Sequence, residues 1–171
     1  MTEHRLYLLR HAKSSWDDPR LADHDRPLAP RGERAVRGLR THLAGLVDGP
    51  DLVLCSSARR TTMTLAGIAA ALPAGVHTRI EDRLYAASAA QLLVRLHDVS
   101  DEVGGVMVIG HNPGLEELAH LLVGTGDDAD REKMAAKFPT GALATLVVTG
   151  SWAGLAPAAA GLEAFVVPRD L

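Results

Sequence analysis

Short apolar runs alternate with longer amphipathic stretches along most of the chain. Runs of aliphatic and branched residues bounded by polar or turn residues are typical of buried strands. Five such runs are present, and a weaker one lies near Val76–Ile80; the five are Leu6–Leu9, Leu52–Cys55, Val106–Ile109, Leu143–Val148 and Ala164–Val167. This alternation predicts a mostly parallel sheet with right-handed crossovers and helices on both faces.

Helical spacing of apolar residues fills most of the gaps between these runs. It predicts one helix over Glu33–Val47 and another around Leu115–Leu122. Asn112 is expected to cap the second helix, with Pro113 in its first turn. The chain therefore has the strand and helix content of an α/β fold with a mostly parallel sheet covered on both faces.

Three parts of the chain depart from this alternation. Residues 14–30 and 124–139 are polar segments without clear periodicity, and long ordered loops in compact domains often carry function. Residues 143–148 and 162–167 are separated by a loop rich in Gly, Ala and Pro that contains Trp152, which predicts an antiparallel hairpin at the sheet edge. No internal repeat or linker is evident, so residues 1–171 are expected to form one domain.

Composition excludes several functional classes. With 171 residues and 47% apolar content, the chain can bury one core without metals or disulfides, and the lone Cys55 is expected in that core. A net charge of −3 with scattered cations and 4% aromatic residues argues against nucleic-acid binding. Because no window approaches the roughly 18 apolar residues that span a bilayer, and no signal-peptide pattern is present, a cytoplasmic protein without membrane contact is expected.

Basic side chains follow three of the predicted strands. Arg10 and His11 come after the first, Arg59 lies in the Ser56–Thr62 segment after the second, and His111 follows the strand that ends near Ile109. Because the carboxyl ends of parallel strands share one sheet edge, we expect these groups to surround one pocket. Such a pocket suits a phosphate dianion, since each charge-assisted hydrogen bond contributes about 1.5–3 kcal/mol.

The same groups can perform phosphoryl transfer. Arginines nearby are expected to keep His11 unprotonated, and a backbone carbonyl on one ring nitrogen would leave the other free to attack phosphorus. The resulting phosphohistidine would be hydrolysed by water, with His111 donating to the phosphoryl group. Lys13 and Ser14 can extend the phosphate cradle, or Lys13 can be an exposed loop residue. We expect Arg60 to face solvent, because adjacent helical positions diverge by about 100°.

These segments resemble the histidine phosphatase superfamily, also called phosphoglycerate mutase-like. The resemblance rests on Arg10-His11, on Ser56-Ser57-Ala58-Arg59 with Thr62, and on Gly110-His111-Asn112-Pro113, and it covers most of the chain. Leu9–Ser14, Arg26–Leu28 with Arg31-Gly32, and the small size resemble the SixA-type phosphohistidine phosphatases. The resemblance implies a three-layer α/β/α sandwich of the phosphoglycerate mutase-like type, in which no metal or organic cofactor is needed. It also implies that His11 is the phosphorylated nucleophile and that Arg10, Arg59 and His111 bind the phosphoryl group.

The segment after the third strand departs from the pattern of larger superfamily members. Those proteins carry a glutamate that protonates the leaving oxygen, whereas this chain has Ile80-Glu81-Asp82-Arg83. Asp82 is the nearest match, and Glu81 is the alternative. A general acid contributes roughly 10²–10⁴-fold for an alkoxide leaving group. A protonated imidazole departs without such help, so the altered segment favours a phosphohistidine substrate or an activated ester.

The sequence predicts a metal-independent phosphatase that acts on a phosphorylated protein or a small phosphorylated metabolite. Two alternatives stay open. A mutase would return the phosphoryl group to a rebound intermediate, but the chain lacks insertions that would enclose a sugar acid. A catalytically weak phospho-binding protein would use the same pocket, but it would have no need of the nucleophile His11.

Overall fold

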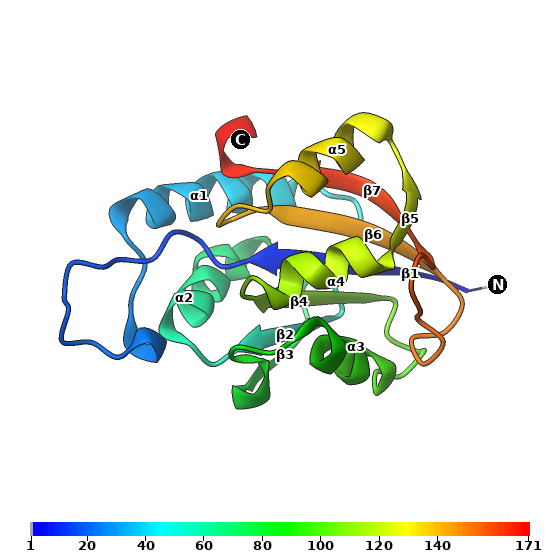
Figure 1. The fold of residues 1–171 in the computed structure, drawn as a ribbon, viewed down its shortest axis with the longest axis horizontal. Helices are drawn as coiled ribbons and strands as arrows, with labels where there is room; N and C mark the ends of the chain where they lie inside the picture. The colour runs from blue at the N-terminus through cyan, green and yellow to red at the C-terminus, as the bar shows by residue number, and fades with distance from the viewer. Residues whose placement is uncertain (1) are drawn as a thin grey trace.

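A seven-stranded sheet forms the centre of the computed structural model, which describes residues 2–171 (Figure 1). Its spatial order is β3-β2-β4-β1-β6-β7-β5. All neighbouring pairs are parallel except those that involve β6, which runs antiparallel to β1 and β7. The strands are β1 (Glu3–Arg10), β2 (Leu52–Ser56), β3 (His77–Glu81), β4 (Gly105–Gly110), β5 (Val123–Gly126), β6 (Leu143–Thr149) and β7 (Ala160–Val166).

Helices cover both faces of the sheet, which gives the expected three-layer α/β/α sandwich (Figure 1). One face packs against α1 (Pro30–Ala44) and α2 (Arg59–Ile68). The other packs against α3 (Ala89–His97), α4 (Gly114–Leu122) and α5 (Asp128–Ala136). Four short 3₁₀ helices complete the described structure: η1 (Asp23–Asp25), η2 (Ala69–Ala71), η3 (Asp82–Leu84) and η4 (Pro168–Asp170).

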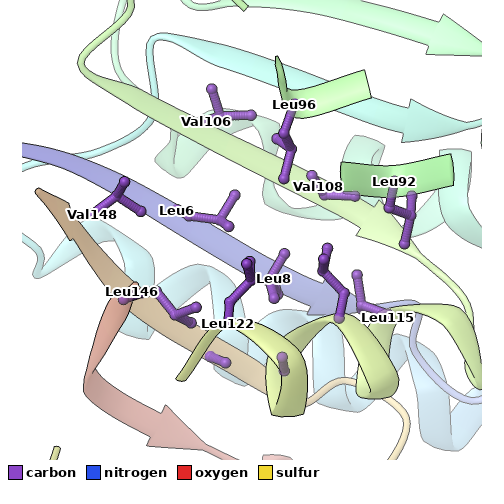
Figure 2. Packing of buried hydrophobic residues seen from close by; sticks show 14 of the residues in the cluster. Leu6, Leu8, Leu92, Leu96, Val106, Val108, Leu115, Leu122, Leu146 and Val148 are labelled. Carbon is purple, nitrogen blue, oxygen red and sulfur yellow. The ribbon is translucent and has the colours of Figure 1, made fainter. Parts of the chain in front are cut away.

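The central strand β1 is buried on both faces, which explains its uninterrupted apolar run. Leu6 and Leu8 belong to the cluster under α3 and α4, and Leu9 belongs to the cluster under α1 and α2. Figure 2 shows Leu6 and Leu8 of β1 in the same cluster as Leu115 and Leu122 of α4. Each buried aliphatic side chain contributes about 1.5–3 kcal/mol of transfer free energy. This packing fixes where β1 ends, and therefore where His11 lies.

The C-terminal part of the sheet differs from the prediction in one respect. β6 and β7 are antiparallel neighbours, as expected, but β5 lies outside them and forms the sheet edge. Residues 124–139, expected as a loop, contain the end of β5 and all of α5. Met134 is the one buried residue of α5, so the segment carries no helical apolar pattern. Among residues 2–171, no helix is long and apolar enough to cross a bilayer.

Two predictions about single residues have different outcomes. Cys55 is fully buried in the core, as expected. The expectation that Asn112 caps α4 is wrong: the N-cap is Pro113, without a side-chain hydrogen bond. The Asn112 side-chain amide instead donates to the Phe138 carbonyl oxygen at 2.9 Å. Asn112 thus joins the start of α4 to the segment that precedes β6.

Candidate active site

The ends of β1 and β4 place two histidines side by side. Arg10 and Gly110 are register partners in these parallel strands, so His11 and His111 leave the sheet at the same level. Their ring centroids are 5.2 Å apart, and both side chains are largely buried. The sheet edge therefore brings the two predicted histidines together.

His11 is held as a neutral base. Its Nδ1 lies 2.7 Å from the Ala12 carbonyl oxygen, which can only accept, so Nδ1 carries the proton and Nε2 has a free lone pair. Burial is the main cause that lowers the pKa of His11 to about 3; the Ala12 hydrogen bond raises the pKa in part, and the nearby His111, Arg60 and Arg10 lower it. The Ala12 amide donates to Thr64 Oγ1 of α2, which anchors this turn. His11 is therefore an unprotonated imidazole at neutral pH.

His111 is also uncharged, but in the opposite tautomer. Its Nδ1 lies 3.3 Å from Arg60 Nη2, which can only donate, and its Nε2 lies 2.8 Å from Ser56 Oγ. Burial is the main cause that lowers the pKa of His111 to about 4, followed by the charge of Arg60. To donate from Nδ1 to a phosphoryl oxygen, His111 must first gain a proton. A bound dianion favours that gain, because an opposite charge nearby stabilises the imidazolium.

Arg60, not Arg59, is the arginine that α2 brings to this site. Arg60 is buried and donates to Asp23 Oδ2 at 3.0 Å as well as to His111, whereas Arg59 is exposed. The prediction that Arg59 enters the pocket while Arg60 faces solvent is therefore wrong. The missed signal is the helical spacing, because Arg60, Thr64 and Ile68 are four residues apart and lie on the buried face of α2.

Arg10 supplies positive charge and forms no ion pair within residues 2–171. Its Nη1 donates to the Phe138 carbonyl oxygen at 3.0 Å, and its buried Nε has no hydrogen-bond partner among residues 2–171. Burial lowers the pKa of Arg10, partly offset by the charge of Glu116. Buried donors without a partner cost free energy, and an anion beside His11 would relieve that cost.

Asp23 connects the site to the long loop before α1, and no sequence motif pointed to this residue. Its carboxylate accepts hydrogen bonds from Arg60, from Arg26 and, at 2.5 Å, from the Tyr85 hydroxyl. Tyr85 is the largest of the causes that lower the pKa of Asp23 to about 2. The Tyr85 ring also lies edge-on to His111, with centroids 5.5 Å apart. Asp23 therefore orients Arg60 while remaining ionised at neutral pH.

Lys13 and Ser14, two and three residues after His11, make their contacts away from the two histidines. Ser14 is buried and its hydroxyl accepts a hydrogen bond from Arg26 at 2.5 Å. Lys13 is exposed and lines a separate cleft. The expected extension of the phosphate cradle by Lys13 and Ser14 is thus not present in this arrangement, and the alternative of an exposed Lys13 is confirmed.

The two acidic residues after β3 lie in different settings. Glu81 pairs with Arg95 at 2.9 Å and with Arg83 at 2.8 Å. The hydrogen bond from Arg95 is the main cause that lowers the pKa of Glu81 to about 2. A carboxylate with this pKa is ionised near neutral pH and cannot act as the proton donor. Asp82 is exposed at the start of η3 and has no ion pair within residues 2–171.

Metal-ligating residue types do not cluster in the described part of the chain. No group of three or more His, Cys, Asp or Glu side chains is arranged to hold a metal ion within residues 2–171. The positive charge of the site comes instead from Arg10 and Arg60.

Several known proteins are similar to this chain in sequence. The model of the histidine phosphatase superfamily (branch 1) matches residues 6–92. The uncharacterised protein Rv1276c of Mycobacterium tuberculosis is 40% identical over 163 residues, which cover 94% of this chain and all of that protein.

Solved structures of similar fold include histidine phosphatases. A candidate phosphohistidine phosphatase SixA of Nakamurella multipartitia is 31% identical, with a TM-score of 0.85 and 98% of each chain covered. The protein histidine phosphatase SixA in complex with tungstate shares the fold, with a TM-score of 0.70 at 19% identity and coverage of 97% of this chain and 98% of that chain. The chain therefore belongs to the histidine phosphatase superfamily, branch 1.

Proposed function

We propose that this protein is a metal-independent phosphatase that transfers the phosphoryl group of phosphohistidine, or of a small phosphomonoester, to His11 and then to water. The observation that carries the proposal is the state of His11. Its Nδ1 proton is held by the Ala12 carbonyl, so Nε2 is free, and the neighbouring Arg10 has a buried Nε without a hydrogen-bond partner among residues 2–171. A neutral nucleophile beside two arginines suits attack on a phosphoryl dianion.

In the first step, Nε2 of His11 forms a bond to phosphorus while the bond from phosphorus to the leaving atom breaks. Arg10 and Arg60 bind the equatorial phosphoryl oxygens, on which charge is spread in the transition state. His111, protonated when the dianion binds, donates to the same group. In the second step, water attacks phosphorus, the bond between phosphorus and Nε2 breaks, and the electron pair returns to His11. The proton of the water leaves with orthophosphate or to solvent.

The acidic groups around the site favour a P–N bond as the one that is broken. Asp23 and Glu81 both have pKa values of about 2 and are ionised, so neither can protonate an alkoxide. Asp82 is the remaining candidate acid, and it is exposed. A phosphoimidazole protonated on its other ring nitrogen leaves as neutral imidazole and needs no such donor. A protein phosphorylated on histidine is therefore the preferred substrate, and similarity to candidate SixA structures supports this choice.

Phosphate release in excess EDTA tests the proposal. The substrates are a phosphohistidine-bearing protein and an aryl phosphate, and the variants are His11→Ala and His77→Ala, a control at an exposed residue of β3. We expect the wild type and His77→Ala to release phosphate equally, and His11→Ala to lose at least about 10³-fold in rate, as for removal of a nucleophile. Activity that needs a divalent metal would contradict the proposal, as would wild-type binding of either substrate without phosphate release.

A further inference from the structure

A cleft lined by cations lies beside the phosphoryl site. It has a volume of about 700 Å³ and is formed by α1, the end of α5 and the C-terminal η4, which lie near one another in Figure 1. Six of its lining residues are basic and none is acidic; the basic ones are Lys13, Arg31, Arg34, Lys133, Lys137 and Arg169.

This local charge is opposite in sign to that of the chain, which has a formal net charge of −3. Lys133 is paired with Asp170, whereas the other five lining cations form no ion pair within residues 2–171. Unpaired cations on the walls of one cleft add their potentials and attract an anionic partner.

Short backbone links connect the cleft to His11. The Gly141 amide donates to the His11 carbonyl oxygen at 3.0 Å, and the Phe138 carbonyl accepts from Arg10. Lys137, Pro139 and Thr140 of the same segment line the cleft. Lys13 lies two residues after His11 and borders the cleft as well. A partner whose phosphoryl group reaches His11 would therefore meet these cations with its neighbouring residues.

The lining favours an acidic protein segment over a small ligand. Small-molecule pockets are mostly apolar and aromatic with a few fixed polar groups, but this cleft has no aromatic lining residue. All of its basic side chains except Lys133 are exposed. Solvated, flexible cations of this kind steer an acidic surface into place and contribute many weak contacts.

We propose that the cleft between α1, α5 and η4 docks an acidic segment, rich in Asp or Glu, of the phosphorylated protein whose phosphoryl group enters the His11 site. This proposal rests on the proposed function and defines its substrate class. The cleft selects the partner through charge, while the phosphoryl site performs the chemistry.

Two synthetic peptides with one phosphohistidine test the proposal, the first flanked by a run of glutamates and the second by glutamines. We expect the wild type to hydrolyse the glutamate peptide with a kcat/KM about tenfold higher at low salt, an advantage that falls as salt is added. The double variant Arg34→Glu/Lys137→Glu should lose this advantage. The control Arg37→Glu/Arg40→Glu makes the same charge change on exposed α1 residues that do not line the cleft, and it should keep the advantage.

Aryl phosphate hydrolysis separates docking from catalysis. Both double variants should hydrolyse it at the wild-type rate, which also shows that they are folded. Equal peptide preference in the wild type and in Arg34→Glu/Lys137→Glu would overturn the docking proposal while leaving the phosphatase intact. Binding of inorganic triphosphate, but not of the unphosphorylated glutamate peptide, would overturn it in favour of a small polyphosphate ligand. If the wild type instead hydrolysed both substrates no faster than His11→Ala, the proposed function itself would be rejected.

Discussion

Two adjacent arginines at the start of α2 have different environments. Arg60 is buried between Asp23 and His111, and Arg59 is exposed. We predict that Arg60→Ala lowers kcat/KM for an aryl phosphate by about 10²–10³-fold, the usual effect of removing one preorganised group that stabilises the transition state. Arg59→Ala should stay within about twofold of the wild type. Equal losses in the two variants would contradict the assignment of Arg60.

The two neutral histidines make stability depend on pH. An unfolded histidine has a pKa near 6.5, whereas in the folded protein the pKa is lowered to about 3 for His11 and to about 4 for His111. As pH falls from 6.5 towards 4.5, the unfolded state takes up protons that the folded state does not. The free energy of unfolding should therefore decrease by about 1 kcal/mol per pH unit for each histidine.

Urea unfolding at pH 7, 6 and 5 checks this prediction. The lowered pKa values of the carboxylates Asp23 and Glu81, about 2 each, affect stability only below about pH 4.5, because their unfolded values lie near 4. His11→Asn should remove roughly half of the slope, and His77→Asn should leave it unchanged. A slope that is the same in His11→Asn and in the wild type would show that His11 is not held neutral by the fold.

At the scale of elements, predictions succeeded where an element carries its own apolar pattern. β1, β2 and β4 are buried on both faces, so their runs are continuous and their C-terminal ends could be located to within one residue, whereas β1 begins three residues earlier than its apolar run. α5 lacks such a pattern because only Met134 is buried. The loop of residues 14–30 brings Asp23 to Arg60 through contacts distant in sequence, and no local spacing encodes such contacts.

The first turn of α1 packs directly on the loop after β1. A Cβ on Gly32 would lie 2.1 Å from the Lys13 carbonyl oxygen, so Gly32→Ala must displace the backbone two residues from His11. We predict a loss of about 1–3 kcal/mol in stability, typical of overpacking, together with lower activity. In Gly38→Ala, on the same helix, the new Cβ would meet only the Leu171 side chain, at 3.3 Å.

Gly38→Ala is the matched control, because alanine has a higher helix propensity than glycine by about 1 kcal/mol. It should be neutral or stabilising in thermal unfolding. A Gly32→Ala variant as stable and as active as Gly38→Ala would show that the close packing of α1 on this loop does not matter.

At the scale of the whole molecule, topology explains how much of the site was predictable. Arg10, His11 and His111 lie at the ends of β1 and β4, which are neighbours in the sheet, and the shared edge of parallel strands brings them together. The helical phase of Arg60 and the partners of Glu81 depend on packing across elements, so the residue order alone did not determine them. The charged cleft was not predictable from the sequence for the same reason, because its cations come from four separate parts of the chain.

The most direct test of the central claim is to trap the phosphorylated enzyme. The protein is mixed with a phosphohistidine substrate and quenched in alkali within milliseconds, and its peptides are analysed by mass spectrometry. The proposed function predicts a transient phosphoryl group on His11 that forms and decays at rates compatible with turnover and is absent from His11→Ala. Turnover without a phosphoryl group on His11, or with one on His111 instead, would contradict it.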